Sequence, residues 1–233
     1  MSGHSKWSSI KRAKGATDAK KGAIFTKLSK NISLAAKNGK DPSMNSALRT
    51  AIDAAKAANM PKDNIERAIL RGAGELPGQL IEELTYECYG PGGVAIMIRC
   101  STDNTNRTAT FIKTTLSKAG GNLGGPGTVN YLFQKKGIVR IEKSADELQL
   151  IAMDAGADDI VEEDDGLTIY TSPETLDAVK DAMGDDVELA EIHLVPLTKV
   201  NVSKEEDKGR IEKLLSDLEE NEDIDETYHN AEL

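Results

Sequence analysis

The stretch EELTYECYGPGGVAIMIRC, residues 82–100, marks a change of periodicity along the chain. Residues 82–89 alternate apolar and polar side chains, residues 94–100 are an almost continuous apolar run, and such patterns with β-branched and aromatic residues are typical of strands. The turn Gly90-Pro91-Gly92-Gly93 joins them. Two such runs around a glycine-containing turn predict a β-hairpin.

The two cysteines, Cys88 and Cys100, both lie in this hairpin. In the expected register Cys100 faces about residue 83, which places it ~17 Å from Cys88 at 3.3 Å per residue. That separation is too long for a disulfide. We therefore expect both thiols to pack in the core or at an edge, in the reducing conditions of a cytoplasmic protein.

On the N-terminal side of the hairpin, apolar residues recur at spacings of three and four, which predicts helices. The expected helices cover residues 23–38, about 42–59 and about 61–71. Asp41-Pro42 is the predicted start of the second helix, because Asp is a good cap and Pro suits the first helical position. Together they predict a small three-helix domain.

On the C-terminal side, a helix is expected over 107–119 and a strand over 128–133. The order βαββαβ then fills residues 137–196, as in a ferredoxin-like unit. Residues 198–233 supply a helix and a strand that the ββαβ module at 80–134 lacks. The segment 137–196 is therefore predicted to be an insertion.

The predicted fold class is α+β: a helical N-terminal three-helix domain followed by two ferredoxin-like α/β lobes, the second inserted in the first. The predicted domains are 1–75, a basic helical domain with an N-terminal arm; 76–136 plus 197–233, an α/β lobe; and 137–196, an inserted acidic ferredoxin-like lobe.

The charge is divided unevenly between these parts. Residues 1–75 hold 15 Lys and Arg against 6 Asp and Glu, whereas the rest of the chain holds 14 basic and 33 acidic residues. Such asymmetry favours nucleic-acid contact by the basic part. The alternative is that the charge only keeps a modest core soluble, and for the acidic part this is the simpler interpretation.

Positive charge at phosphate spacing is the main requirement for binding a polyanion. The N-terminal arm, the first helix with its outward-facing lysine stripe and the third helix carry the candidates. The predicted nucleic-acid-binding residues are Lys6, Trp7, Lys11, Arg12, Lys14, Lys20, Lys21, Lys27, Lys30, Lys62, Arg67 and Arg71. Trp7 either stacks on a base or sugar or is buried against the helices.

Signatures of catalysis are absent from the sequence. The glycine-rich stretch 120–127 follows a helix and precedes a strand, the reverse of a phosphate-binding loop. The three His lie in separate segments, and no acidic loop has calcium-site spacing. We expect no catalytic residue, no metal, no cofactor, no secretory signal and no membrane contact.

Several motifs closely resemble those of the YebC family, and the resemblance covers essentially the whole chain. They are GHSKW (3–7), DAKKG (18–22), IFTKL (24–28), AANMPKDNIERAI (57–69), YGPGGV (89–94), TDN (102–104) with NRT (106–108), GGNLG (120–124) and YHNA (228–231). Residues 10–14 read Ile-Lys-Arg-Ala-Lys, whereas the family usually has Ile-Lys-His-Arg-Lys. The contacts of residues 11–14 are therefore not carried over.

The resemblance implies a three-domain, cytoplasmic, DNA-binding transcriptional regulator. Relatives that include a mitochondrial translational activator act instead on the ribosome. The sequence thus predicts a non-enzymatic nucleic-acid-binding regulator of gene expression, first as a DNA-binding transcriptional regulator. The alternatives are a ribosome-associated translation factor that binds structured rRNA, and a protein-docking module that uses its acidic lobes.

Overall fold

The computed structural model describes residues 18–76, 81–142, 146–163 and 165–233, with side chains from residue 24 onward apart from that of residue 146. The chain forms two compact units. One covers residues 131–199, and the other combines the segments before and after residues 131–199. The helical segment and the first α/β lobe belong to the same unit.

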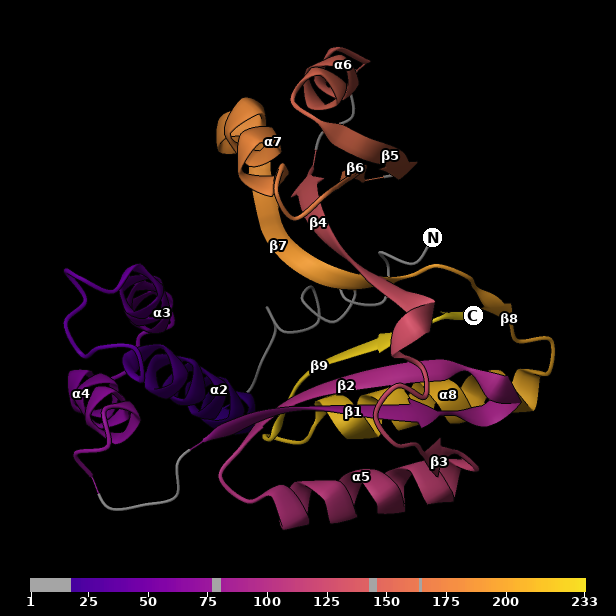
Figure 1. Ribbon diagram of the computed structural model, residues 1–233, viewed down its shortest axis with the longest axis horizontal. Helices are drawn as coiled ribbons and strands as arrows, with labels where there is room; N and C mark the ends of the chain where they lie inside the picture. The colour runs from indigo at the N-terminus through magenta and orange to yellow at the C-terminus, as the bar shows by residue number, and fades with distance from the viewer. Residues whose placement is uncertain (1–17, 77–80, 143–145, 164) are drawn as a thin grey trace. The chain divides into compact units, whose positions relative to one another are not determined.

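Three helices open the described chain: α2 (Asp18–Ala36), α3 (Ser46–Ala57) and α4 (Lys62–Gly72) (Figure 1). Their shared core is built from Ile32, Leu48, Ile52, Ala55, Met60, Ile65 and Ala68. The apolar spacing of three and four places these side chains on one face of each helix. The predicted three-helix arrangement is confirmed.

Helix α3 begins later than predicted. Its cap is Asn45, whose side chain accepts a hydrogen bond from the Leu48 N–H at 3.0 Å. The carboxylate of Asp41 instead accepts hydrogen bonds from the backbone and hydroxyl of Ser43, which closes a local turn. The expected cap residue is therefore used in the preceding loop.

Helices α2 and α4 approach each other closely at Gly72. A Cβ atom at this position would lie 2.1 Å from the Ser33 carbonyl oxygen, which no side chain tolerates. One turn away, the Ser33 hydroxyl donates a hydrogen bond to the Ala68 carbonyl at 2.8 Å. This contact fixes the spacing of the two helices.

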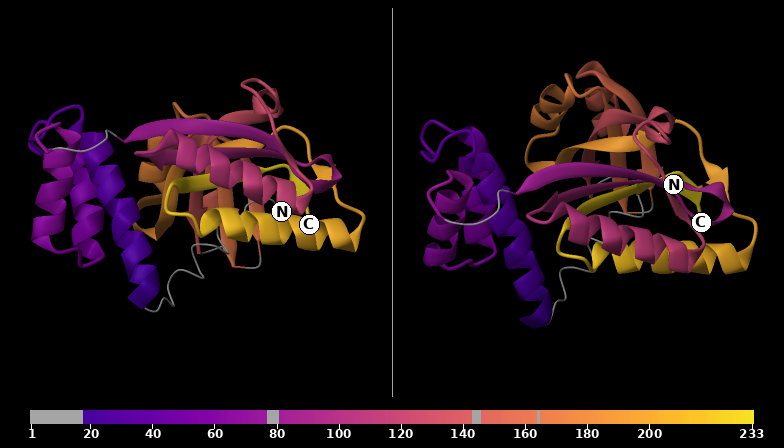
Figure 2. Two further views of the ribbon diagram at one scale, coloured as in Figure 1. Left: turned by 90° about the horizontal axis from the view of Figure 1, so that it is seen from below. Right: turned by 60° about the horizontal axis from the view of Figure 1, so that its bottom comes forward.

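The first α/β lobe is a four-stranded sheet with the order β3-β1-β2-β9. Its strands are β1 (Glu82–Tyr89), β2 (Ala95–Thr102), β3 (Asn122–Leu123) and β9 (Ile224–His229). Helices α5 (Thr105–Ala119) and α8 (Glu205–Glu219) cover one face (Figure 2). A 3₁₀ turn, η1 (Pro91–Gly93), links β1 to β2, and the short strands β8 (Val200–Asn201) and β10 (Ala231–Glu232) pair separately.

This lobe departs from the predicted ferredoxin-like connectivity. Strands β1 and β2 form the hairpin that the sequence predicts, so no helix lies between them and the lobe does not have the βαββαβ order of a ferredoxin-like unit. The strand predicted over 128–133 is also wrong, since residues 130–132 form the 3₁₀ turn η2 (Asn130–Leu132). The buried carboxylate of Glu87 holds this segment by accepting N–H bonds from Gly127, Val129 and Asn130 at 2.7–2.8 Å.

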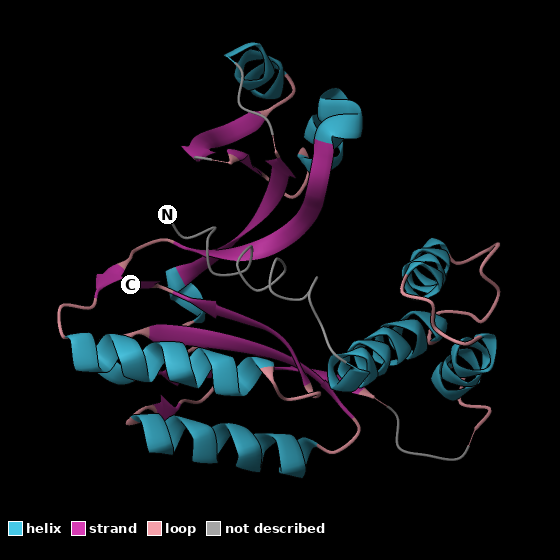
Figure 3. Cartoon of the chain, turned by 180° about the vertical axis from the view of Figure 1, so that it is seen from behind, coloured by secondary structure: helices cyan, strands magenta, loops and turns pink. Residues whose placement is uncertain are grey.

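The unit over 131–199 contains β4 (Phe133–Ile141), α6 (Asp146–Asp154), β5 (Ala157–Glu163), β6 (Gly166–Thr171), α7 (Leu176–Met183), the turn η3 (Gly184–Asp186) and β7 (Val187–Pro196) (Figure 3). Its antiparallel sheet has the order β5-β6-β4-β7. Both helices pack on one core with Val139, Ile141, Leu167 and Ile169. This βαββαβ unit has the ferredoxin-like order that the sequence predicts.

The cysteines lie four residue positions apart along the paired strands β1 and β2 of the first sheet. Cys100 pairs with Leu84, one residue from the expected partner, and Cys88 pairs with Ile96. Both thiols are free and buried. The prediction that they pack in the core without a disulfide is confirmed.

Candidate nucleic-acid interface

Part of the predicted cationic surface lies outside the described residues. This holds for Lys6, Trp7, Lys11, Arg12 and Lys14. The backbone of Lys20 and Lys21 belongs to α2, but their side chains are likewise outside the described part. The described candidates are therefore two lysines of α2 and three cations of α4.

Lys27 on α2 is half-buried rather than displayed to solvent. Burial lowers the pKa of its ammonium group, because the charged form loses hydration. Asp225, Glu219 and Glu226 oppose that change by attracting the charge. The Lys27 side chain thus faces acidic residues of the first α/β lobe.

Lys30 is buried, with 9% of its surface exposed. Its ammonium group donates hydrogen bonds to the Ser101 carbonyl at 2.8 Å, the Glu222 carbonyl at 2.7 Å and the Asp223 carboxylate at 2.8 Å. An ammonium group has three donors, so all are used within the protein. The predicted outward-facing lysine stripe is therefore wrong at Lys30.

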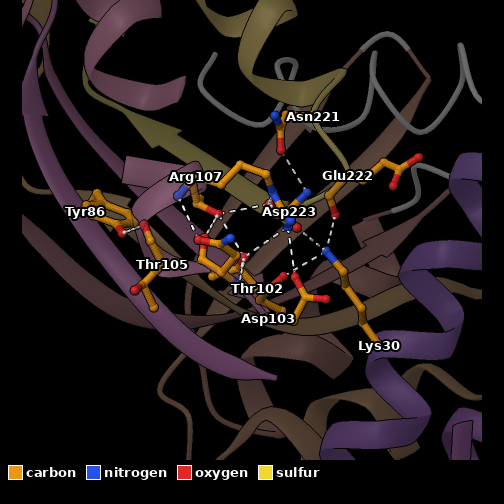
Figure 4. A network of polar contacts seen from close by, with 12 residues as sticks. Lys30, Tyr86, Thr102, Asp103, Thr105, Arg107, Asn221, Glu222 and Asp223 are labelled. Atoms are coloured by element: carbon orange, nitrogen blue, oxygen red, sulfur yellow. Dashed lines mark hydrogen bonds and ion pairs between the residues drawn. The ribbon is translucent and has the colours of Figure 1, made fainter. Parts of the chain in front are cut away.

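The carboxylate of Asp223 is the centre of this polar cluster (Figure 4). Its second oxygen accepts hydrogen bonds from Arg107 Nη2 at 2.7 Å, Arg107 Nε at 3.1 Å and the Thr108 hydroxyl at 2.9 Å. Burial alone raises the pKa of Asp223, but the bonds from Lys30, Arg107 and Thr108 outweigh it and lower the pKa to about 2. The carboxylate is therefore ionised at neutral pH.

We call this cluster the Asp223 junction, and it comprises Lys30, Thr102, Arg107, Thr108 and Asp223. The local backbone structure orients the side chains that meet there. The Asn104 side chain caps α5 by accepting the Arg107 N–H at 3.0 Å, and the first turn of this helix places the Arg107 and Thr108 side chains toward Asp223. The Asn221 side chain accepts the Asp223 N–H at 2.9 Å and shapes the turn before β9. The junction ties α2 to the lobe.

The remaining predicted cations, on α4, are exposed. The Lys62 side chain is exposed to solvent, and its ion pair with Glu66 at 3.4 Å lies on the surface. Arg67 and Arg71 are one helical turn apart, so they lie on the same side of α4. Their guanidinium groups have no ion-pair partner among the residues that the structure describes.

Two exposed cations on α3, Arg49 and Lys56, were not singled out by the sequence analysis. Lys56 pairs with Asp53 at 3.6 Å on the surface, whereas Arg49 has no such partner in the described segments. Because they belong to the same helical bundle as Arg67 and Arg71, they extend its positive charge. Their position on the polar side of an amphipathic helix was a signal that could have identified them.

A cleft of about 590 Å³ lies where α2, the end of α4, the start of α5 and residues 220–223 meet. Its lining carries both signs of charge, since Arg71 and Arg107 face it together with Asp103, Glu220 and Glu222. The carboxylates repel a polyanion from the interior of the cleft. Contact with phosphate is therefore better placed outside the cleft, on the exposed cations of α3 and α4, of which Arg71 alone also borders the cleft.

The described residues offer little chemistry for catalysis. Burial raises the pKa of both Cys88 and Cys100 to about 12, so neither thiol is a thiolate at neutral pH. No group of His, Cys, Asp or Glu in the described segments is arranged to hold a metal ion. Nor does any helix there combine the length and hydropathy of a membrane span.

The fold defines an α+β protein whose N-terminal helices α3 and α4 carry exposed cations and whose later lobes have an excess of acidic residues. Residues 5–75 match the family model described as the TACO1/YebC protein N-terminal domain, and residues 81–231 match the TACO1/YebC second and third domain. The chain belongs to the TACO1/YebC family.

Relatives match over the full length of the chain. Proteins named probable transcriptional regulatory protein in Kosmotoga olearia and Dictyoglomus turgidum are each 49% identical, covering 100% of this chain and 95% and 96% of theirs. The crystal structure of the conserved hypothetical protein Aq1575 from Aquifex aeolicus is 43% identical with a TM-score of 0.81, covering 94% of this chain and 93% of that one.

Proposed function

We propose that the protein is a non-enzymatic nucleic-acid-binding regulator of gene expression that acts on DNA as a transcriptional regulator. The observation that carries the proposal is the set of exposed cations on α3 and α4, with Arg49, Arg67 and Arg71 free of ion pairs in the described part of the chain. The relatives named probable transcriptional regulatory protein support the choice of DNA.

The Asp223 junction supports this proposal by fixing the helices that carry the cations. Lys30 is bound at three acceptors of the first lobe, so α2, and with it α3 and α4, is held in a defined position. A rigid array of cations loses less entropy on binding than a mobile one. We accordingly assign Lys30 a structural role and leave phosphate contact to the outward residues.

Phosphate contacts fix a protein on nucleic acid but carry no direct sequence information. The exposed residues of α3 and α4 mix Arg and Lys with Ala and with the acidic Asp53, Asp63 and Glu66, which does not form a set of base-edge contacts. We therefore expect shape and backbone charge to dominate recognition. Structured rRNA offers the same chemistry, so a ribosome-associated role in translation is the alternative outcome of the test below.

The test compares a double charge reversal, Arg67→Glu with Arg71→Glu, against the matched reversal Lys180→Glu with Lys199→Glu. All four side chains are exposed, so each variant should fold. Affinity for duplex DNA and for rRNA fragments is titrated at several salt concentrations. Each lost phosphate contact should flatten the slope of log affinity against log salt by up to ~0.9 on duplex DNA.

The proposal predicts weaker binding and a flatter slope for the α4 variant only, with similar losses across DNA sequences. Wild-type preference for rRNA over duplex DNA at matched salt would favour the translation alternative. Equal binding by both variants and wild type would show that α4 is not the nucleic-acid surface.

A further inference from the structure

Helix α6 exposes large apolar side chains on the face that does not pack in the core. Leu150 is 68% exposed and Met153 is 57% exposed. Ala152 and Leu148 of the same helix pack against the core of the 131–199 unit. The core of the unit is covered by the opposite face of α6. The outer face with Leu150 and Met153 is therefore free to bind a partner.

This face continues into a groove shared with strand β5. The groove has a volume of about 470 Å³, and Leu150, Met153 and Ile160 form its apolar lining. Asp158, which is paired with Lys136 at 2.5 Å, and Asp159 border it on the strand side. Apolar residues line this groove and carboxylates lie beside it. It therefore suits a ligand that carries apolar and basic side chains at neighbouring positions.

Strand β5 is also the outer strand of its sheet, with β6 as its neighbour on the inner side. An outer strand presents backbone N–H and C=O groups that a further extended segment can pair with. Alternate side chains of an added strand point to the same side. Every second residue of such a segment would therefore reach the groove.

Charge decides which occupant fits. The 131–199 unit holds 17 Asp and Glu against 6 Lys and Arg, and Asp158, Asp159 and Glu162 are exposed on β5 itself. A phosphate backbone is repelled by this surface. A second copy of the chain pairing β5 with β5 would set carboxylates against carboxylates, which is how edge strands are protected from self-association.

We propose that the groove between α6 and β5 binds an extended, basic segment of a partner protein. The segment adds to the outer edge of β5 and places alternate apolar side chains over Leu150 and Met153. The Lys or Arg side chains between them point to the other face of the sheet and pair with Asp159, which alternates with the core-facing Ile160 along β5. This surface and the cations of α3 and α4 are formed by different residues in different compact units, so the proposal does not depend on the proposed nucleic-acid contact.

The test uses the full chain and a fluorescent peptide, Lys-Val-Arg-Val-Lys-Ile-Arg, with Glu-Val-Glu-Val-Glu-Ile-Glu as its charge-reversed counterpart. Anisotropy titration should give saturable binding of the basic peptide only. The double variant Leu150→Ser with Met153→Ser should weaken it at least tenfold. The matched variant Ile192→Ser with Leu197→Ser removes apolar side chains of similar exposure, 47% and 55%, and should leave it unchanged.

Hydrogen exchange supplies a second readout, because strand addition should slow exchange of β5 amides when the basic peptide is bound. Charge reversal by Asp159→Lys should weaken binding by a similar factor. The proposal is overturned by absent or non-saturable binding, by equal binding of the acidic peptide, or by equal effects of the two serine variants. Loss of DNA or rRNA affinity in the Leu150/Met153 variant would assign the groove to nucleic acid instead, and self-association that this variant abolishes would assign it to a second copy.

Discussion

Removal of the Asp223 carboxylate should strongly destabilise the contact between α2 and the first lobe. In Asp223→Ala, the ammonium group of Lys30 stays buried and loses its only anionic partner at the junction, while Arg107 and Thr108 lose an acceptor. Breaking a buried ion pair by deleting one partner costs ~3–5 kcal/mol.

The size of the effect follows from how well each partner can return to water. The Arg107 side chain is 55% exposed and can be rehydrated, whereas that of Lys30 is 11% exposed and cannot. We therefore expect the lower end of the range, ~3 kcal/mol. With an m-value of ~2 kcal/mol/M in urea, the midpoint should fall by ~1.5 M.

The assay is urea unfolding at pH 7 followed by circular dichroism, with hydrogen exchange to locate the change in α2, α5 and residues 220–224. A double-mutant cycle with Lys30→Met should give a coupling energy of ~1–3 kcal/mol, because both single changes act on one pair. The control cycle, Asp53→Ala with Lys56→Met, affects an exposed pair at 3.6 Å and should give less than ~0.5 kcal/mol. Equal coupling energies in the two cycles would refute the structural role of the junction.

Three further outcomes are expected. The pKa of Asp223 falls from its ordinary 3.8 to about 2 on folding. The stabilisation by its ionised carboxylate is therefore present above pH ~4 and is lost as the pH drops toward ~2. Unfolding measured as a function of pH should show that wild type loses ~2 kcal/mol more stability than Asp223→Asn over that interval. Replacing Cys88 or Cys100 by Ser should lower the free energy of unfolding in urea by ~1–3 kcal/mol, because both positions are buried and a hydroxyl group loses its hydration there. Nucleic-acid affinity should be unchanged. Lost affinity at unchanged stability would contradict the assignment of both thiols to core packing. Thermal unfolding should show Gly72→Ala strongly destabilised, since its Cβ meets a backbone carbonyl, whereas Gly209→Ala in an open helix position should gain ~0.5–1 kcal/mol; similar effects of the two would argue against close packing of α2 and α4.

Short-range patterns were sufficient to predict most secondary structure. The three-four spacing in the N-terminal segment identified α2, α3 and α4, and the alternation around Gly90–Gly93 identified the β1–β2 hairpin within one residue of its register. These elements depend on neighbours along the chain, which is where periodicity carries information. The start of α3 was missed because Asp41 and Asn45 are both good caps, and only the fold selects between them.

The nucleic-acid-binding residues could be predicted only in part from sequence patterns. A count of lysines does not distinguish an exposed ammonium group from a buried one, so Lys30 was placed on the surface. Its acceptors at Glu222 and Asp223 lie almost two hundred residues further along the chain. No local pattern reports a contact over that separation.

The sequence by itself determined most of the helical and strand segments, the βαββαβ order of residues 137–196 and the separation of basic from acidic charge. Only the tertiary structure decided that Lys30 serves the Asp223 junction, that Arg67 and Arg71 stay exposed, and that α6 and β5 form a groove. The physical reason is that local backbone preference and hydrophobic periodicity are set by neighbouring residues. Burial of a charge and the shape of a groove depend instead on which distant segments meet.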